Sequence, residues 1–353
     1  MTNMEEQIRK YMDSWDLSEA DEATRSALEG FLSEWFSPSP MLRVHTSGST
    51  GKPKELLVRK EQMRNSAVTT CRFLGLQAKD SALLCMPLQY IAGKMVVVRA
   101  ITSGLHLIVQ TPSGHPMKSG RKDLRFAAMI PLQVFNSLQD ETEREALRSI
   151  RQLIIGGGAI DADMEEELRH FPNAVYSTYG MTETLSHIAL RLISGEKASG
   201  YYTPFEEVGL SLSDDGTLII DAPRVCDTKL VTNDIAELLP DQRFRIIGRR
   251  DNTINTGGIK VQIEVVEEKL KPHLSAPFAI TYVKDAKFGN AVVLLLEAPA
   301  RIPGEQLNEW LPVYERPKHC FAVDSIPQTG SGKTDRAHSH QLAEACLAQT
   351  QNN

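Results

Sequence analysis

Short apolar runs alternate with longer amphipathic segments through the first half of this chain of 353 residues. Each apolar run has the length of a buried strand, and each longer segment repeats its apolar positions with the period of a helix. Such alternation is typical of layered α/β folds, in which helices connect the strands of a largely parallel sheet. The expected strands are 81–86, 105–110, 126–130, 153–155 and 174–177, and the expected helices are 60–74, 92–102, 131–138 and 161–170.

The chain on either side of this region has a different pattern. Residues 5–35 are expected to form one helix, which the Ser37-Pro38-Ser39-Pro40 segment ends before a short strand at 42–45. From about residue 203, short apolar runs with tight turns indicate a small β subdomain, and Asp214-Asp215-Gly216 marks a hairpin within it.

Residues beyond about 250 are expected to form a compact α+β unit. Its expected helices are 262–271, 304–310 and 335–348, and its expected strands are 278–283, 291–296 and 319–323. The sequence therefore predicts two domains: a large layered α/β domain with a β subdomain at 1–249, and a small α+β domain at 250–353.

The composition limits the partners of the chain. Its net charge of −6 gives no electrostatic reason to expect nucleic acid or an anionic membrane surface as a partner. We expect no secretory signal at the start, and no apolar run is long enough to cross a bilayer. The five cysteines are scattered without a CxxC pair, which favours reduced, mostly buried thiols in a cytoplasmic protein. The nine histidines show no metal-ligand spacing.

A polar loop, expected between a strand and a helix, is the first segment that points to chemistry. Residues Thr46-Ser47-Gly48-Ser49-Thr50-Gly51-Lys52-Pro53-Lys54 combine hydroxyls, glycines and lysines. Glycines let backbone N–H groups close around an anion, hydroxyls donate further hydrogen bonds and lysines supply charge. This combination indicates a triphosphate site, with a flexible surface loop as the alternative.

Two Gly-Lys segments could be mistaken for a Walker loop, but neither fits that motif. Pro53 follows Gly51-Lys52, where that motif requires Ser or Thr. Gly330-Ser331-Gly332-Lys333-Thr334 ends in GKT, but the first glycine of the motif would have to stand at Pro327. A P-loop phosphotransferase, which would release ADP, is therefore disfavoured.

Further segments carry residues suited to a nucleotide. The glycines of Gly156-Gly157-Gly158-Ala159 let the backbone approach a flat ligand. Tyr179 and Glu183 would offer an aromatic slot for a base and a carboxylate for Mg²⁺ near phosphates. Arg249 and Asp251 would by themselves be an ordinary surface ion pair. The segments are 156–159, 177–183, 232–234, 248–260 and 327–336.

In this order, the segments resemble the motifs of the adenylate-forming superfamily, which includes acyl- and aryl-CoA ligases, peptide-synthetase adenylation domains and luciferases. The resemblance covers about residues 42–340. It implies a large N-terminal adenylation domain and a small mobile C-terminal lid. It also implies that ATP and Mg²⁺ convert a carboxylic acid to an acyl-adenylate, which is then joined to coenzyme A.

The resemblance assigns roles to individual residues. Tyr179 would stack on adenine, while Thr182 would contact the phosphates and Glu183 would help to hold Mg²⁺. Lys333 would be the catalytic lysine between the carboxylate and the α-phosphate, and Asp251 would be the hinge of the lid. The other implied contacts with ATP or coenzyme A are Thr46, Ser47, Gly48, Ser49, Thr50, Gly51, Lys54, Gly157, Gly158, Ala159, Ser177, Thr178, Gly180, Asp234, Arg249, Gly257, Gly258 and Lys260.

Residues 86–95 occupy the place of the family's acyl-pocket motif. Together with residues 179–187 they resemble the 2-succinylbenzoate–CoA ligases of menaquinone biosynthesis, whose substrate is a dianionic aromatic acid. A cation in the pocket would suit such an acid, although Lys94 and Arg99 could also be solvated. The candidate substrate contacts are Gln89, Tyr90, Lys94, Arg99, Ser186 and His187.

The sequence departs from the family pattern at two places, and several alternative activities stay open. Asn233 stands where the family usually has glycine, which asparagine can replace in a left-handed turn. The family usually has a much longer segment before the phosphate loop than the 45 residues here, so we expect part of the N-terminal subdomain to be missing, with effects on oligomerisation or the acyl pocket, and we leave a homodimer open. The alternatives are another acid, a carrier protein as acceptor, or a nucleotide-binding module without turnover.

Overall fold

The computed structural model describes residues 3–45, 55–300, 303–328 and 334–351. The chain divides into two compact units. The first comprises residues 1–210, 220–230 and 239–244, and the second comprises residues 211–219, 231–238 and 245–353. The domain boundary expected near residue 250 stays a prediction.

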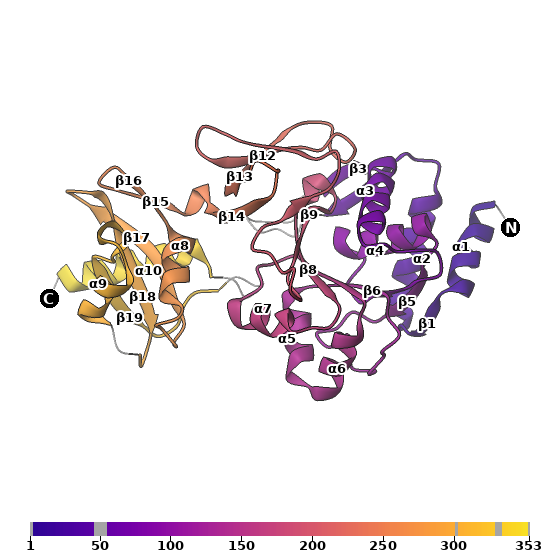
Figure 1. The fold of residues 1–353 in the computed structure, drawn as a ribbon, viewed down its shortest axis with the longest axis horizontal. Helices are drawn as coiled ribbons and strands as arrows, with labels where there is room; N and C mark the ends of the chain where they lie inside the picture. The colour runs from indigo at the N-terminus through magenta and orange to yellow at the C-terminus, as the bar shows by residue number, and fades with distance from the viewer. Residues whose placement is uncertain (1–2, 46–54, 301–302, 329–333, 352–353) are drawn as a thin grey trace. The chain divides into compact units, whose positions relative to one another are not determined.

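An eight-stranded sheet forms the centre of the first unit, in the order β1-β5-β4-β6-β7-β8-β9-β10 (Figure 1). Neighbouring strands from β1 to β8 are parallel, whereas β9 and β10 join antiparallel, so the expected largely parallel sheet is confirmed. The strands are β1 (Asp16–Glu19), β4 (Ser81–Leu84), β5 (His106–Gln110), β6 (Phe126–Met129), β7 (Gln152–Ile155), β8 (Ala174–Gly180), β9 (His187–Leu192) and β10 (Thr203–Pro204).

The helices of the first unit complete the α/β layers. Residues Gly93–Ala100 of α4 are all buried, as expected for a helix that is covered on every side. Gly93 is needed there, because a Cβ at this position would lie 2.5 Å from the carbonyl oxygen of Pro87. The helices are α1 (Asn3–Ser14), α2 (Glu22–Phe36), α3 (Lys60–Phe73), α4 (Ile91–Ser103), α5 (Pro131–Gln139), α6 (Glu141–Ser149) and α7 (Ala162–Arg169).

Two expectations for the N-terminal region were wrong. Residues 5–35 are not one helix, because β1 interrupts them and pairs with β5. The Asp21 carboxylate then caps α2 by accepting a hydrogen bond from the Thr24 N–H at 2.8 Å. The polar loop at 46–54 does not lie between a strand and a helix either, because it joins the antiparallel strands β2 (Met41–His45) and β3 (Glu55–Arg59), and α3 follows β3.

A four-stranded sheet of neighbouring strands β11-β12-β13-β14 follows in the chain. The expected hairpin at Asp214–Gly216 is confirmed: residues 213–216 join two adjacent strands, Gly216 has a φ of +78°, and the Ser213 N–H donates to the Thr217 carbonyl at 2.9 Å. The strands are β11 (Gly209–Leu212), β12 (Thr217–Asp221), β13 (Leu230–Leu238) and β14 (Phe244–Arg249).

A five-stranded sheet forms the centre of the second unit, with helices packed on it (Figure 1). Its later strands and helices agree with the expected α+β pattern, whereas the hairpin β15–β16 was not expected. The strands are β15 (Thr253–Thr256), β16 (Ile259–Gln262), β17 (Phe278–Asp285), β18 (Gly289–Glu297) and β19 (His319–Val323), and the helices are α8 (Ile263–Leu270), α9 (Leu307–Trp310) and α10 (Arg336–Gln351).

The chain on either side of residues 329–333 is held by backbone and side-chain bonds. Gln328 and Thr334 form an antiparallel bridge, and the Asp335 N–H donates to the Pro327 carbonyl at 2.8 Å. Arg336, the first residue of α10, forms a bidentate ion pair with Glu267 of α8 at 2.6 and 2.7 Å. The two ends of this segment are therefore fixed to the second unit.

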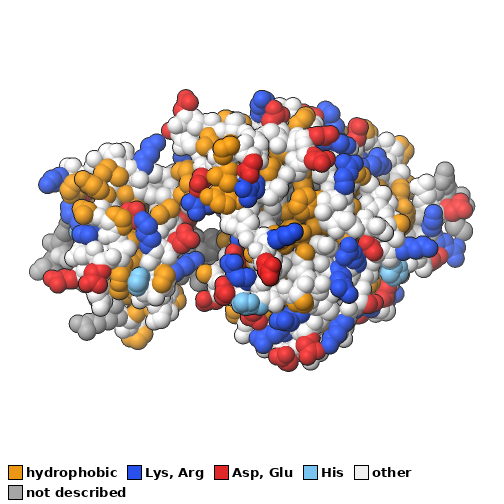
Figure 2. Space-filling model, in the orientation of Figure 1, with side chains coloured by type: hydrophobic (Ala, Val, Ile, Leu, Met, Phe, Trp, Pro, Cys, Tyr) orange, Lys and Arg blue, Asp and Glu red, His pale blue; other side chains and the backbone are white. Residues whose placement is uncertain are grey.

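All five cysteines are free thiols, as expected, but the expectation that most are buried was wrong, because Cys226, Cys320 and Cys346 are only half-buried. Cys71 and Cys85 are buried, and burial raises the pKa of Cys85 to about 12. None of the described helices combines the length and apolar character needed to span a bilayer. On the face drawn in Figure 2, acidic and basic side chains are interspersed.

Candidate active site

The predicted site residues of the first unit follow the carboxyl ends of neighbouring parallel strands. The triple glycine follows β7, and the Tyr179–Glu183 segment spans the end of β8 and the turn after it. The carboxyl ends of parallel strands meet at one edge of a sheet, which is where ligands bind in open α/β folds. The first unit therefore places these two motifs beside each other.

Close backbone approach joins the two motifs. A Cβ on Gly156 would lie only 2.4 Å from the Thr178 Oγ1, so a larger residue would displace this side chain. Gly157 has a φ of +80°, which favours glycine. Gly157 and Ala159 are exposed, and Gly158 is half-buried. The glycines thus let the turn after β7 lie against β8 while their backbone stays accessible to a ligand.

Gly180 is needed where β8 meets β9. A Cβ there would lie 2.3 Å from the Ser186 carbonyl oxygen and 2.5 Å from the His187 Cα, both backbone atoms. We expect Gly180→Ala to lower the free energy of unfolding by about 1–3 kcal/mol, because the strands must separate to admit the methyl group. Urea denaturation measures this. Gly200→Ala is the control, since its Cβ would meet no atom within 4 Å, and equal losses in the two variants would contradict the prediction.

Thr182 and Glu183 lie in a short 3₁₀ helix, Thr182–Thr184, directly after β8. The Glu183 side chain is exposed, and within the described residues its carboxylate forms neither a hydrogen bond nor an ion pair. Its oxygens are therefore available to a metal. A single carboxylate beside phosphate oxygens is a common protein contribution to Mg²⁺ coordination.

An aromatic cluster surrounds Tyr179. The ring centroid of Tyr179 lies 5.8 Å from that of Tyr202 and 5.1 Å from that of Phe244, and the Ser177 Oγ lies 2.9 Å from the Tyr202 hydroxyl oxygen. The Arg191 guanidinium lies over the Tyr202 ring, with its Cζ 5.6 Å from the ring centroid. These contacts fix the ring of Tyr179, so that its predicted role beside a base has a rigid support.

Arg99 is fully buried and has one hydrogen-bond partner among the described residues. Its Nη2 donates to the Ser186 Oγ at 2.8 Å, while its Nε is buried without a partner. No described carboxylate forms an ion pair with it. Burial lowers the pKa of the Arg99 guanidinium to about 10, so it remains protonated at neutral pH. A buried cation without a counter-ion is costly to maintain.

Ser186 and His187 connect Arg99 to a second helix. The Ser186 Oγ lies 3.2 Å from the His187 Nδ1, and the His187 Nε2 lies 3.0 Å from the Thr70 Oγ1. Burial, and then the neighbouring Arg99 charge, hold the pKa of His187 well below its usual value. His187 is therefore neutral in this network.

The other predicted substrate contacts lie elsewhere. Gln89 and Tyr90 are exposed on the loop before α4. The Lys94 Nζ donates to the Arg43 carbonyl at 2.8 Å and lies 3.8 Å from the Glu34 carboxylate, and burial lowers the pKa of Lys94 despite this carboxylate. Lys94 thus ties α4 to β2 and α2, while Arg99 on the same helix joins Ser186.

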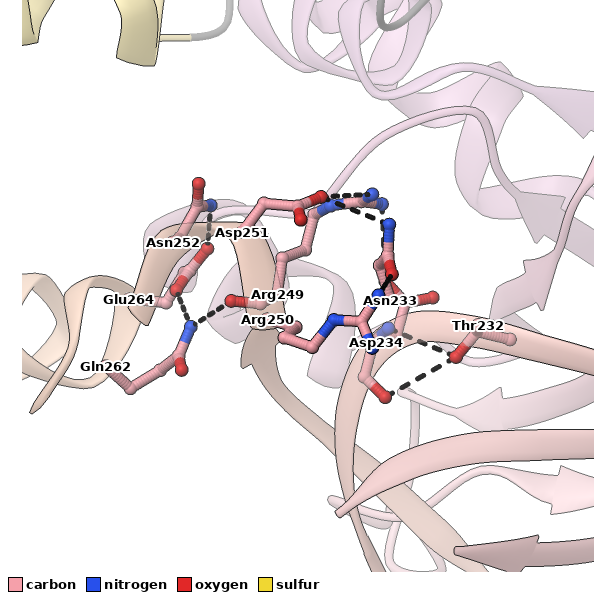
Figure 3. Close-up of polar contacts among 9 residues, drawn as sticks. All are labelled: Thr232, Asn233, Asp234, Arg249, Arg250, Asp251, Asn252, Gln262 and Glu264. Carbon is pink, nitrogen blue, oxygen red and sulfur yellow. Dashed lines mark hydrogen bonds and ion pairs between the residues drawn. The ribbon is translucent and has the colours of Figure 1, made fainter. Parts of the chain in front are cut away.

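A second group of predicted residues lies in the second unit, and we call Asn233, Asp234, Arg249, Arg250 and Asp251 the hinge cluster (Figure 3). The Asp251 carboxylate accepts hydrogen bonds from the Asn233 amide at 3.2 Å and from Arg249 at 3.4 Å. Arg249 also contacts the Asp234 carboxylate at 3.4 Å, and Arg250 donates to the Asn233 amide oxygen at 2.6 Å. Asp251 is therefore bonded to residues that precede it in the chain.

The remaining predicted contacts of the second unit surround a tight turn. Gly257 and Gly258 have φ values of +58° and +84° and form the two-residue turn between β15 and β16, as glycines do in hairpins. Lys260 is exposed, and its Nζ lies 3.4 Å from the Asp215 carboxylate. The structure thus gives the glycines a local backbone reason, apart from any ligand.

Two predicted segments lie outside the described residues. These are the phosphate loop, with Thr46, Ser47, Gly48, Ser49, Thr50, Gly51 and Lys54, and the segment with Lys333. The roles of all predicted site residues stay predictions.

The sequence did not indicate three residues that support the site. Tyr202 and Phe244 flank Tyr179, and Thr70 bonds to His187. The Tyr201-Tyr202 pair after Gly200 is a local signal that could have drawn attention to an aromatic cluster. No comparable signal marks Thr70.

Comparisons with known proteins agree with this geometry. The AMP-binding enzyme family matches residues 6–226. Among curated relatives, a 2-succinylbenzoate–CoA ligase of Bacillus cereus (strain Q1) is 25% identical to this chain. The match covers 90% of this chain and 73% of the ligase. The 2-succinylbenzoate–CoA ligase of Geobacillus sp. (strain WCH70) is 26% identical and covers 85% of this chain and 68% of that protein.

Solved structures with a similar fold include two ligases. The acyl-CoA synthetase (AMP-forming)/AMP-acid ligase II-like protein of Dyadobacter fermentans has a TM-score of 0.64 and 28% identity, and covers 92% of this chain and 95% of that chain. The o-succinylbenzoate CoA synthetase of Bacillus subtilis, in complex with its acyl-adenylate intermediate, has a TM-score of 0.69 and 23% identity, and covers 84% of this chain and 68% of that chain.

Proposed function

The chain belongs to the AMP-binding enzyme family of adenylate-forming ligases, and we propose that it joins 2-succinylbenzoate to coenzyme A through an acyl-adenylate. The relatives named 2-succinylbenzoate–CoA ligase support this choice of acid. We expect the product to serve menaquinone biosynthesis. The proposal extends to ATP as the second substrate of the first step and to Mg²⁺ as the metal that accompanies it.

The buried, unpaired Arg99 is the observation that carries the choice of acid. A dianionic acid retains a second carboxylate when the first is activated, and this carboxylate needs a cation that water does not screen. The Arg99 guanidinium keeps unused N–H donors, including a buried Nε. An arginine can bind a carboxylate with two parallel hydrogen bonds. The second carboxylate would therefore supply the counter-ion that Arg99 lacks in the described residues.

The motifs at the edge of the first sheet support the binding of the nucleotide. Tyr179, held by Tyr202 and Phe244, would offer its ring to adenine, and Thr182 would donate to a phosphate oxygen. The unpaired Glu183 carboxylate would hold Mg²⁺, which neutralises charge on the phosphates. Asp234 and Arg249 of the hinge cluster would bond to the ribose hydroxyls.

Lys333 would act in the first step by charge stabilisation. The acid carboxylate attacks the α-phosphorus, its oxygen forms the new P–O bond, and pyrophosphate leaves with the electrons of the broken bond. Two anions approach each other in this step, so an ammonium group between them stabilises the transition state. Residues 250–353 would then rotate about Asp251 and withdraw Lys333, and the thiolate of coenzyme A would displace AMP.

A pyrophosphate-release assay over a panel of acids tests this function. We expect release with Mg·ATP and 2-succinylbenzoate, AMP rather than ADP as the nucleotide product, and the thioester only when coenzyme A is present. The matched acid is 4-oxo-4-phenylbutanoate, which has one carboxylate instead of two, and we expect it to react much more slowly. Turnover on a different acid would overturn the substrate, and ATP binding without release on any acid would overturn the ligase.

A further inference from the structure

A line of hydrogen bonds connects Arg99 to the interior of α3. It runs from Arg99 in α4 through Ser186 and His187 to Thr70, and every neighbouring pair of polar atoms lies within 3.2 Å. The Thr70 hydroxyl continues it to the Ser66 carbonyl, one helical turn earlier, at 3.0 Å. Arg99, His187 and Thr70 are buried. We call Arg99, Ser186, His187 and Thr70 the buried relay.

The chemistry of its members gives the relay one direction. A threonine hydroxyl has a single hydrogen, and Thr70 donates it to the Ser66 carbonyl. The Thr70 oxygen must therefore accept from the His187 Nε2–H. A neutral imidazole carries one hydrogen, so the His187 Nδ1 is an acceptor for the Ser186 hydroxyl. The Ser186 oxygen is then free to accept from Arg99, which can only donate.

The opposite direction leaves a group unsatisfied. If Thr70 donated to the His187 Nε2, the His187 Nδ1–H would donate to Ser186. The Ser186 oxygen would then accept from both His187 and Arg99, and its own hydrogen would have no acceptor among the described residues. A polar hydrogen left without a partner in a buried network is unfavourable. The first direction gives a partner to each polar hydrogen of Ser186, His187 and Thr70.

We propose that Thr70 and His187 are positioning residues for recognition of the acid, because the relay directs the Ser186 hydrogen to His187 and leaves the Ser186 oxygen to accept from Arg99 alone, which holds the Arg99 guanidinium in one orientation. This inference rests on the proposed function, in which Arg99 binds the second carboxylate of the substrate. Neither Thr70 nor His187 touches the acid in this assignment. Their effect is to keep the remaining donors of Arg99 directed to one place, which binding a planar carboxylate requires.

Thr70→Val and Thr70→Ser form a matched pair of variants for the kinetic test. Valine retains the size of threonine but removes the acceptor for His187, whereas serine retains the hydroxyl and removes a methyl group. We expect Thr70→Val to raise the KM for 2-succinylbenzoate about tenfold, which corresponds to ~1.4 kcal/mol, with little change in kcat. We expect Thr70→Ser to stay near the wild type, and the KM for 4-oxo-4-phenylbutanoate to be unchanged in both variants.

A purely structural role of Thr70 would give a different result. Thr70→Ser would then lose as much as Thr70→Val, or both acids would be affected equally, and either outcome would overturn the proposal. Thermal unfolding of both variants identifies a general loss of stability. A variant that fails to fold is replaced by His187→Gln, for which we expect the same rise in KM for the dianionic acid alone.

The hydrogen positions can be measured without any substrate. Imidazole ¹⁵N shifts in histidine-labelled protein, assigned by comparison with His187→Gln, report which ring nitrogen carries the hydrogen. We expect the neutral Nε2–H form for His187 in the wild type and in Thr70→Ser, and loss of this preference in Thr70→Val. An Nδ1–H form in the wild type would overturn the relay whatever the substrate is. Failure of the proposed function would appear separately, as a wild type that does not turn over 2-succinylbenzoate.

Discussion

Replacing Lys333 by alanine is expected to slow formation of the acyl-adenylate by about 10³-fold, while transfer of the acyl group from preformed acyl-adenylate to coenzyme A changes only a few-fold. The reason is the charge of each step. Removing one preorganised donor from a charged transition state typically costs about 10²–10³-fold in rate, and here two anions meet in the first step. In the second step no carboxylate has to approach the α-phosphate, because the acid is already joined to it as a mixed anhydride.

Two separate assays decide this prediction. Pyrophosphate release measures the first half-reaction, and thioester formation from synthetic acyl-adenylate measures the second. Lys284→Ala is a suitable control, because it removes an exposed lysine of the same unit, which contacts Asn290 at 3.2 Å. Equal losses in both half-reactions for Lys333→Ala would show that Lys333 does not have the assigned role.

Arg99→Gln is expected to lower kcat/KM for 2-succinylbenzoate by about 10²–10³-fold, because breaking a buried charge pair typically costs ~3–5 kcal/mol. Glutamine is shorter and neutral, so the second carboxylate would bind without a counter-ion. Arg99→Lys retains the charge but not the planar guanidinium that binds a carboxylate with two hydrogen bonds. We expect a smaller loss of kcat/KM for this variant. Neither variant should lower kcat/KM for 4-oxo-4-phenylbutanoate.

The fold should survive the Arg99→Gln change. Because no described carboxylate pairs with Arg99, its neutral replacement leaves no buried anion behind, and the free energy of unfolding should stay the same or rise. Urea denaturation measures this beside the kinetics. A loss of activity that is equal for both acids would show that Arg99 does not select the dianion.

The sequence predicted the sheet of the first unit well where the strands are buried on both faces. All four residues of β6 are buried, so their apolar run had no other reading than a central strand. β1 escaped notice because Asp16, Ser18 and Glu19 are polar, and its place at the sheet edge depends on pairing with β5, about 90 residues later. Sequence periodicity is local and cannot report such pairing.

The candidate site shows the same division between local and distant information. Motif spacing placed Tyr179, Glu183 and the triple glycine at strand ends, where the structure has them. Motif spacing could not show that Lys94 and Arg99, which lie on one helix, have different partners. Only the structure shows this, since Lys94 bonds to Arg43 and Arg99 to Ser186.

Thr70 marks the limit of what the sequence could predict. A threonine inside a helix is a weak helix former that commonly bonds to its own backbone. Its partner His187 lies 117 residues later in the chain. The relay exists only because α3 and β9 pack together, which no motif records.

The bridge between Gln328 and Thr334 joins the two ends of residues 329–333 through backbone bonds that lie outside them. Closure of this segment depends on backbone bonds outside it and on the Arg336–Glu267 pair, so the conformational entropy of closure is offset by bonds that side-chain exchanges at 329–333 leave intact. Breaking the Arg336–Glu267 pair would therefore weaken the hold on the chain next to Lys333 without changing any residue of 329–333.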